Sequence, residues 1–405
     1  MAARAFDKSN ITLSAVVAAP AGWPLPVSNK NWTEGHFDLK STVEYGTKLI
    51  AEARGNGADL VAFPELWFPG YPKSLEAKWM FPLVEEYVAN SLVVGSEEWE
   101  DLRDAARENA IYVSFGFSER EGDFIYMSQA LFGPEGEVLI NRRKLRPSGT
   151  ERGLWSDGST DGLMVVDTKI GRIGMLQCWE HLRPTMTFNI QAQLPNIHVG
   201  AWPYNQNPGA SDVENWEDVE VAYSALRLMS ILTNAVTVTP SIGYGFINQF
   251  TTLLAHSDSN ATAHPNDDQD YASLIYSSVN GSSWSNQSYD LNGEVSWGTL
   301  MQIEDGFPDY IPKVRSLLTP PRTPRRAAAN HITCRRTAVS NVPCHRYIYT
   351  YWSHLEWRGD CRSDRSDAGC AAARSGFSHG CLLPLVMQLG PEVSSRNLLS
   401  ISFSY

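Results

Sequence analysis

Three short segments of the sequence carry side chains that could act together on a polarised carbon atom. Phe63-Pro64-Glu65-Leu66-Trp67 holds a carboxylate, the stretch 141–147 holds the ammonium of Lys144, and the stretch 174–180 holds the thiol of Cys178. A thiol becomes a strong nucleophile once a base takes its proton, and Glu65 could be that base. Lys144 could stabilise the negative charge that develops on the attacked group, an effect worth about 3 kcal/mol. These residue types favour covalent catalysis by a cysteine.

Each of the three residues also has an ordinary structural explanation when it is taken alone. A cysteine after a strand is more often a small buried residue than a nucleophile. Glu65 follows Pro64 and could be an acid in the first turn of a helix, while Lys144 lies in a basic run typical of a solvated face. A shared site is favoured because all three are expected at or just past strand ends, where layered α/β folds bind their ligands.

The elements that would position these residues alternate between strands and helices up to about residue 240. Strand patterns cover 11–19, 59–63, 111–117, 124–132, 138–142, 163–167, 172–177, 196–201 and 236–239. Helical spacing of apolar residues covers 39–54, 97–109, 184–193 and 213–233. The turns at 133–136 and 169–171 predict two hairpins. This alternation predicts an α/β fold in which helices cover stacked sheets.

Composition and charge limit the class of protein. The 405 residues are 43% hydrophobic and 19% charged, which supplies enough apolar material for a core and excludes general disorder. No run of about 18 uncharged apolar residues occurs, so we expect no membrane-spanning helix and no membrane partner. The apolar stretch 11–23 is short and contains Pro20, so we interpret it as a first strand and expect a cytoplasmic protein. The net charge of −12 disfavours nucleic acid as a partner.

Charge and cysteine content change sharply near the Pro-rich stretch 319–326. Residues 311–405 contain 13 Lys and Arg against 5 Asp and Glu, a net charge of +8, whereas the preceding 310 residues carry −20. Five of the six cysteines lie in this tail, and none has the C-x2-C spacing of a zinc site. We therefore divide the chain into a core at 1–240, a divergent polar segment at 241–318 that could complete the domain, and an Arg- and Cys-rich tail at 319–405 that we expect to be poorly ordered.

The three segments resemble the motifs of the nitrilase superfamily, the carbon–nitrogen hydrolases. The stretch 63–72, FPELWFPGYP, resembles the glutamate motif of the nitrilase and cyanide hydratase branch, including its fungal members. Lys144 and the following Thr150-Glu151-Arg152 resemble its lysine motif and second glutamate. The stretch 178–184, CWEHLRP, resembles its nucleophile motif, and 198–203, HVGAWP, resembles a strand end beyond it. The resemblance extends from about residue 11 to residue 240.

The resemblance implies a four-layer α-β-β-α sandwich, here with an atypical C-terminal part, and a catalytic triad. In the triad that it implies, Glu65 is the general base, Lys144 is the electrostatic stabiliser and Cys178 is the nucleophile.

Further residues and properties follow from the same resemblance. It implies that Glu151 is a supporting acid that positions the triad and that Trp179 has a supporting role. Tyr71 and Trp202 are expected to bind substrate. The resemblance implies that no metal and no organic cofactor is needed, and that the protein forms a homo-oligomer.

The implied reaction begins with attack of the thiolate on a nitrile carbon, which gives a thioimidate. Water then adds, and the tetrahedral intermediate loses either ammonia, which leads to the carboxylic acid, or the thiol, which gives the amide. The expected substrate is therefore a small nitrile or cyanide. Two alternatives stay open, an amidase or carbamoylase of the same superfamily and an inactive member that serves as a binding or assembly module. Trp179-Glu180-His181 favours the nitrile branch.

Overall fold

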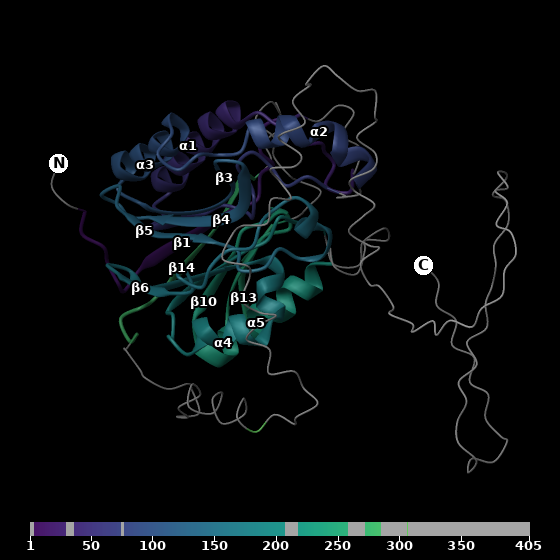
Figure 1. The fold of residues 1–405 in the computed structure, drawn as a ribbon. Coiled ribbons are helices and arrows are strands. Elements are labelled where there is room, and N and C mark those ends of the chain that lie inside the picture. The colour runs from purple at the N-terminus through teal and green to yellow at the C-terminus, as the bar shows by residue number, and fades with distance from the viewer. Residues whose placement is uncertain are drawn as a thin grey trace, which may run out of the picture. The chain divides into compact units, whose positions relative to one another are not determined.

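The computed structural model describes residues 4–29, 36–73, 77–206, 218–257, 272–284 and 306 of the 405-residue chain. The tail predicted at 319–405 lies outside the described residues, as do 258–271 and most of 285–318 in the segment before it. Strands and helices alternate along the described chain, as the sequence predicts (Figure 1).

The first sheet has six strands in the order β14-β1-β2-β3-β4-β5. They are β1 Ile11–Val16, β2 Leu60–Ala62, β3 Tyr112–Glu121, β4 Phe124–Phe132, β5 Val138–Arg143 and β14 Leu274–Val279. The strands β1, β2 and β3 run parallel, with Ser14 opposite Val61 and Ala62 opposite Ser114. The other neighbours are antiparallel. The chain therefore leaves β2 at an inner position of the sheet, between β1 and β3.

The second sheet also has six strands, in the order β13-β12-β10-β8-β7-β6. They are β6 Val165–Thr168, β7 Gly171–Gln177, β8 Ile197–Ala201, β10 Val236–Thr239, β12 Phe246–Gln249 and β13 Thr252–His256. The strands β7, β8 and β10 are parallel, with Gln177 opposite Ala201 and Val199 opposite Val238. A small sheet pairs β9 Tyr204–Asn205 with β11 Ile242–Gly243.

The two large sheets stack on one another and helices cover their outer faces. Buried side chains of both sheets form the central core, among them Leu13, Leu60, Ile173, Val199 and Val238. The helices α1 Leu39–Gly55 and α3 Glu97–Asn109 cover the first sheet, and α4 Pro184–Gln191 and α5 Val219–Thr233 cover the second (Figure 1). The predicted four-layer α-β-β-α sandwich is confirmed. A further helix, α2 Ala77–Ala89, precedes α3.

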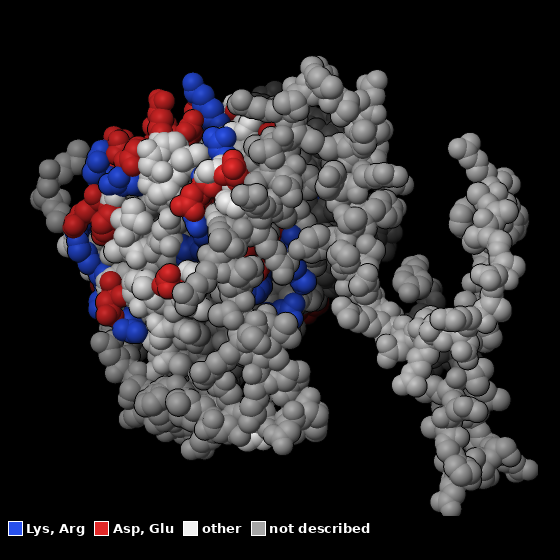
Figure 2. Space-filling model, in the orientation of Figure 1, with Lys and Arg blue, Asp and Glu red and all other residues white. Residues whose placement is uncertain are grey.

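The outer helices have local sequence signals that define where they begin. The Asp38 carboxylate accepts a hydrogen bond of 2.9 Å from the Ser41 backbone N–H and so caps α1, whose buried residues recur at helical spacing. Three acidic residues in the first turn of α3 favour the helix dipole. Acidic and basic side chains are both exposed over the region of α1 and α3 (Figure 2).

Some predicted boundaries differ from the structure. The first strand ends at Val16 instead of residue 19, and the last predicted helix begins at Val219, where Asp218 caps it, while 213–217 lie outside the described residues. The helix α2 was not predicted from the sequence. Neither were β12, β13 and β14, which lie in the segment 241–318 and extend both sheets.

None of the helices in the described part of the chain is long and apolar enough to cross a membrane.

Candidate active site

The three candidate catalytic residues lie just past the ends of three strands. Glu65 follows β2, Lys144 comes directly after β5, and Cys178 comes directly after β7. The strands β2 and β5 belong to the first sheet and β7 to the second, so the site is built where the two sheets meet. All three side chains are buried: Glu65 and Lys144 are 0% exposed, and Cys178 is 6% exposed.

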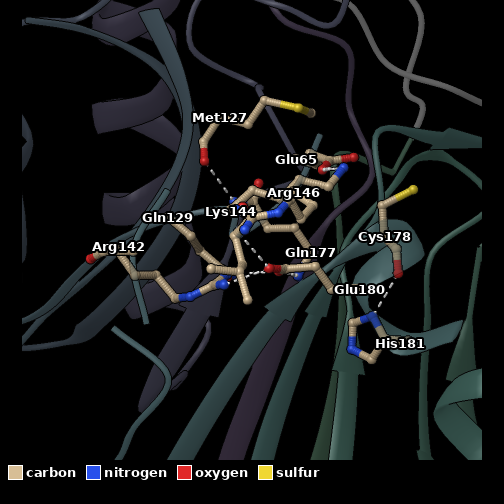
Figure 3. Close-up of polar contacts among 12 residues, drawn as sticks. Glu65, Met127, Gln129, Arg142, Lys144, Arg146, Gln177, Cys178, Glu180 and His181 are labelled. Carbon is tan, nitrogen blue, oxygen red and sulfur yellow. Dashed lines mark hydrogen bonds and ion pairs between the residues drawn. The ribbon is translucent and has the colours of Figure 1, made fainter. Parts of the chain in front are cut away.

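The Lys144 ammonium joins two carboxylates. Its Nζ lies 2.9 Å from Glu65 Oε1 and 2.9 Å from Glu151 Oε2. Glu151 sits in the short 3-10 helix η1 Gly149–Gly153, where it also accepts hydrogen bonds from the Tyr71 hydroxyl at 3.0 Å and from the Ser148 backbone N–H. Glu151 is therefore held by three donors, and Lys144 is fixed between Glu151 and Glu65. Figure 3 shows Lys144 next to Glu65.

Glu65 is the carboxylate of this group with a free oxygen. Its Oε1 accepts from Lys144, while its Oε2 is buried without a hydrogen-bond partner among the described residues. Burial raises the pKa of Glu65 to about 7, and the nearby Lys144 ammonium only partly opposes this shift. A carboxylate with a pKa near neutrality and an unused oxygen is suited to accept a proton.

Lys144 keeps its charge in this buried position. Burial alone would lower its pKa, but the Glu151 and Glu65 carboxylates outweigh that effect and raise the pKa above the usual lysine value. A permanently charged donor at this position can stabilise negative charge that develops nearby.

Cys178 opens the 3-10 helix η2 Cys178–Leu182 with a left-handed backbone, at φ 43°. Non-glycine residues adopt this conformation only when surrounding contacts hold them there, and such residues cluster at functional sites. Burial raises the pKa of the Cys178 thiol well above its usual value; the Glu65 charge adds to this and the Lys144 charge opposes it. The thiol is thus protonated at neutral pH and needs a base to become a nucleophile.

A buried ion pair joins the strand end that carries Lys144 to the turn that carries Cys178. The Arg142 guanidinium binds both carboxylate oxygens of Glu180, at 2.9 and 2.7 Å. Glu180 also accepts from the backbone N–H groups of Leu145 and Gln177, the residues next to Lys144 and Cys178. Glu180 therefore fixes the lysine and the cysteine relative to each other across the two sheets (Figure 3).

The remaining predicted residues lie around this centre. Tyr71 is 3% exposed, and besides bonding Glu151 its ring packs edge-on against Tyr204, with centroids 5.9 Å apart. Trp202 follows β8, and its carbonyl accepts from the Glu65 backbone N–H at 3.2 Å. Trp179 is half-buried and packs against the cluster that contains Cys178 and Trp202. Tyr71 and Trp202 thus contact Glu151 and Glu65, and the substrate binding expected of them stays a prediction.

Sequence reasoning missed the importance of Arg142, Glu180, His181 and Gly116. Arg142 was part of a basic run interpreted as a possible solvated face, yet it is 3% exposed. The signal that could have found it is the alternation in β5, which places Arg142 on the same inward face as Ile140.

Gly116 in β3 allows the Glu65 segment to pass close to the first sheet. A Cβ atom at this position would lie 2.5 Å from the Pro64 carbonyl oxygen and 2.7 Å from Glu65 Cα. We predict that Gly116→Ala lowers the free energy of unfolding by about 1–3 kcal/mol, as overpacking does, and reduces kcat because it displaces Glu65. Thermal unfolding and steady-state kinetics measure the two effects.

Gly55→Ala is the matched control for Gly116→Ala. No atom lies within 4 Å of a Cβ built at Gly55, which ends α1, so stability and kcat should stay near those of the wild type. Equal behaviour of the two variants would contradict the close approach at Gly116.

Among the described residues, no group of three or more His, Cys, Asp or Glu side chains is arranged to hold a metal ion.

The chain is similar in sequence to a known protein family and to curated proteins. Residues 25–225 match the family described as carbon-nitrogen hydrolase. An arylacetonitrilase from Aspergillus kawachii is 44% identical over 172 residues, which cover 41% of this chain and 52% of that protein. A cyanide hydratase from Stereum hirsutum is 44% identical over 176 residues, covering 41% of this chain and 46% of the relative. The chain spans about half the length of the curated relatives that it matches.

Solved structures agree on the fold. The crystal structure of an amidase from Nesterenkonia sp. superposes with a TM-score of 0.51 at 15% sequence identity and covers 74% of this chain and 98% of the amidase. A variant of an amidase from the same genus, described as a member of the nitrilase superfamily, gives the same TM-score at 14% identity. At such identities the likeness concerns the sandwich architecture alone.

Proposed function

Because residues 25–225 of this chain are a carbon–nitrogen hydrolase domain, we propose that the protein hydrolyses nitriles through a covalent intermediate on Cys178. The observation that carries the proposal is the Lys144 ammonium, held at 2.9 Å from both Glu65 and Glu151 at the strand ends beside Cys178. A carboxylate with a free oxygen, a fixed cation and a buried thiol are the groups that such a reaction needs.

In the first step Glu65 takes the thiol proton as Cys178 Sγ attacks the nitrile carbon. A C–S bond forms while one of the three C–N bonding pairs moves to nitrogen, which receives the proton. The product is a neutral thioimidate. Lys144 stabilises the negative charge on the nitrogen side during the attack.

In the second step Glu65 removes a proton from water as the water oxygen adds to the thioimidate carbon. The tetrahedral intermediate then breaks its C–N bond, with nitrogen leaving as ammonia, and a second water hydrolyses the thioester to the carboxylic acid. If the C–S bond breaks instead, the thiol returns to Cys178 and the amide is released. Nitrilase and hydratase outcomes therefore differ only in which bond of one intermediate breaks.

Nitriles are favoured over amides because the relatives at 44% identity are named arylacetonitrilase and cyanide hydratase, whereas the amidases share only the fold at about 15% identity. The test is a set of parallel assays of the full chain with phenylacetonitrile, cyanide and phenylacetamide. Ammonia release and amide formation are both measured. Turnover of the amide alone would identify an amidase, and no turnover at all would support a binding or assembly role.

The homo-oligomer implied by the family resemblance is part of the same proposal. Analytical ultracentrifugation of the full chain measures it, and a monomer at all concentrations would contradict it.

The pH dependence of turnover should report the raised pKa of Glu65. A general base must be ionised, so kcat/KM should rise with pH through about 7 and fall about tenfold per unit below that value. Glu65 at its ordinary pKa would instead give a rate that no longer changes above about pH 5.5. Lys144 stays charged throughout, because its pKa is raised. A rate profile that is flat from pH 5.5 to 8, with the fold intact by circular dichroism, would exclude Glu65 as the titrating base.

A further inference from the structure

Two buried histidines connect the Cys178 backbone to the second sheet. His181 Nδ1 lies 2.8 Å from the Cys178 carbonyl oxygen, and His181 Nε2 lies 2.9 Å from His198 Nε2. His181 belongs to η2 and His198 to β8, and the two are 7% and 0% exposed. Figure 3 shows the His181 ring bonded to the carbonyl of Cys178 on the side opposite the thiol.

The contacts define the tautomers of both rings. A carbonyl oxygen only accepts, so His181 Nδ1 must carry a proton and donate it to Cys178. In a neutral ring His181 Nε2 is then bare and accepts, so that His198 Nε2 must donate. His198 Nδ1 is left as a bare nitrogen, and it has no partner among the described residues.

An extra proton on this pair would be unfavourable. It would place a hydrogen on His198 Nδ1 or between the two facing Nε2 atoms, where no acceptor remains. Burial also lowers the pKa of His181 to about 4 and the pKa of His198 well below its usual value. The two rings are therefore neutral under ordinary conditions.

The strand at the far end of this connection is held rigidly. β8 lies inside the second sheet between β7 and β10, with His198 opposite Gly174 and Thr237. Gly200 leaves room for the imidazole, because a Cβ there would lie 3.2 Å from His181 Nε2 and 2.4 Å from Leu226 Cδ1. The Trp202 ring also packs near His181, with the two ring centroids 5.6 Å apart.

We propose that His181 and His198 are positioning residues that form a neutral imidazole bridge between the Cys178 carbonyl and β8. The bridge holds the left-handed turn at φ 43° from which the thiol is presented. The same strand end also holds Glu65, since the Trp202 carbonyl accepts from the Glu65 backbone N–H. The end of β8 thus aligns the nucleophile and the base, and this inference rests on the proposed role of Cys178.

The kinetic test compares His198→Leu, which removes the donor to His181, with His198→Gln, whose amide can still donate. We expect kcat of His198→Leu to fall between tenfold and about a hundredfold with KM within about twofold, because a displaced nucleophile slows chemistry more than binding. His198→Gln should recover most of the loss.

Met229→Ala is the control for loss of stability alone. Met229 is a buried residue of α5 that packs with Leu176 and Ile190, on the helix-covered side of the same sheet. Its truncation should lower the melting temperature and leave kcat nearly unchanged. The bridge is refuted if His198→Leu loses no more kcat than Met229→Ala, or if His198→Gln is no better than His198→Leu.

A readout without substrate separates this inference from the proposed function. In protein labelled with ¹⁵N-histidine, the ring shifts should show His181 protonated at Nδ1 and His198 protonated at Nε2, and His198→Leu should change the His181 signals. The opposite tautomers would overturn the bridge even in an active enzyme. If the wild type converts no nitrile, the proposed function fails and the tautomers still decide the inference.

Discussion

Replacing Cys178 by alanine should reduce nitrile turnover by at least about 10⁴-fold while the protein remains folded. The proposed route passes through a C–S bond, and no other thiol among the described residues could form it. The change removes one buried sulfur atom, so the free energy of unfolding should fall by only about 1 kcal/mol. Ammonia release measures the first effect and thermal unfolding the second.

Cys178→Ser is the matched variant for this prediction. It keeps the volume and the turn but replaces the thiol by an alcohol, whose proton Glu65 cannot readily take, so it should be nearly as inactive as alanine. Mass spectrometry of the wild type during turnover should show an adduct on the peptide that contains Cys178. Turnover by Cys178→Ala close to that of the wild type would show that the thiol is only part of the core.

The sequence predicted the layered fold because its patterns are local. The alternation of β3, the apolar run of β4, and the apolar spacing and caps of α1 are properties of neighbouring residues. Lys144 and Glu65 were placed together although they are 79 positions apart, because both follow strand ends and because three motifs occur in the expected order.

The parts of the fold that were missed lack such local signals. α2 contains Pro82, which works against a helical prediction. β12 has only four residues and β14 carries serines at two of its six positions, so neither has a long apolar pattern. These strands form because β10 and β1 offer them unpaired edges.

The contacts that align the site could not be predicted for a different reason. In the sequence, Arg142 and Glu180 look like any other basic and acidic residue. They pair only because the two sheets stack on one another. Their pairing at full burial depends on the separation of the sheets, which no pattern along one strand specifies. The same holds for His181 and His198, which come from a 3-10 turn and a neighbouring strand.

Replacing Lys144 by methionine should have the largest combined effect on activity and stability. The change leaves Glu65 and Glu151 buried next to each other without the cation that bonds both at 2.9 Å. Removing one partner of a buried ion pair typically destabilises a protein by roughly 3–5 kcal/mol. Loss of the stabilising donor should also lower kcat by about 10²–10³-fold, as removal of an oxyanion donor does. Chemical denaturation and initial rates measure these effects.

Two further measurements test the Lys144→Met prediction: how the stability of the variant depends on pH, and the stability and rate of Lys169→Met as a control. Without the Lys144 charge, the pKa of Glu65 should rise further, so the variant gains stability as pH falls and this carboxyl becomes neutral. The deficit relative to the wild type should therefore be larger at pH 8 than at pH 5.5. Lys169→Met breaks an exposed pair with Glu135, whose side chains are 48% and 62% exposed, and should change neither stability nor rate. A Lys144→Met protein as stable as Lys169→Met at pH 8 would show that the buried cation is not what holds the two carboxylates together.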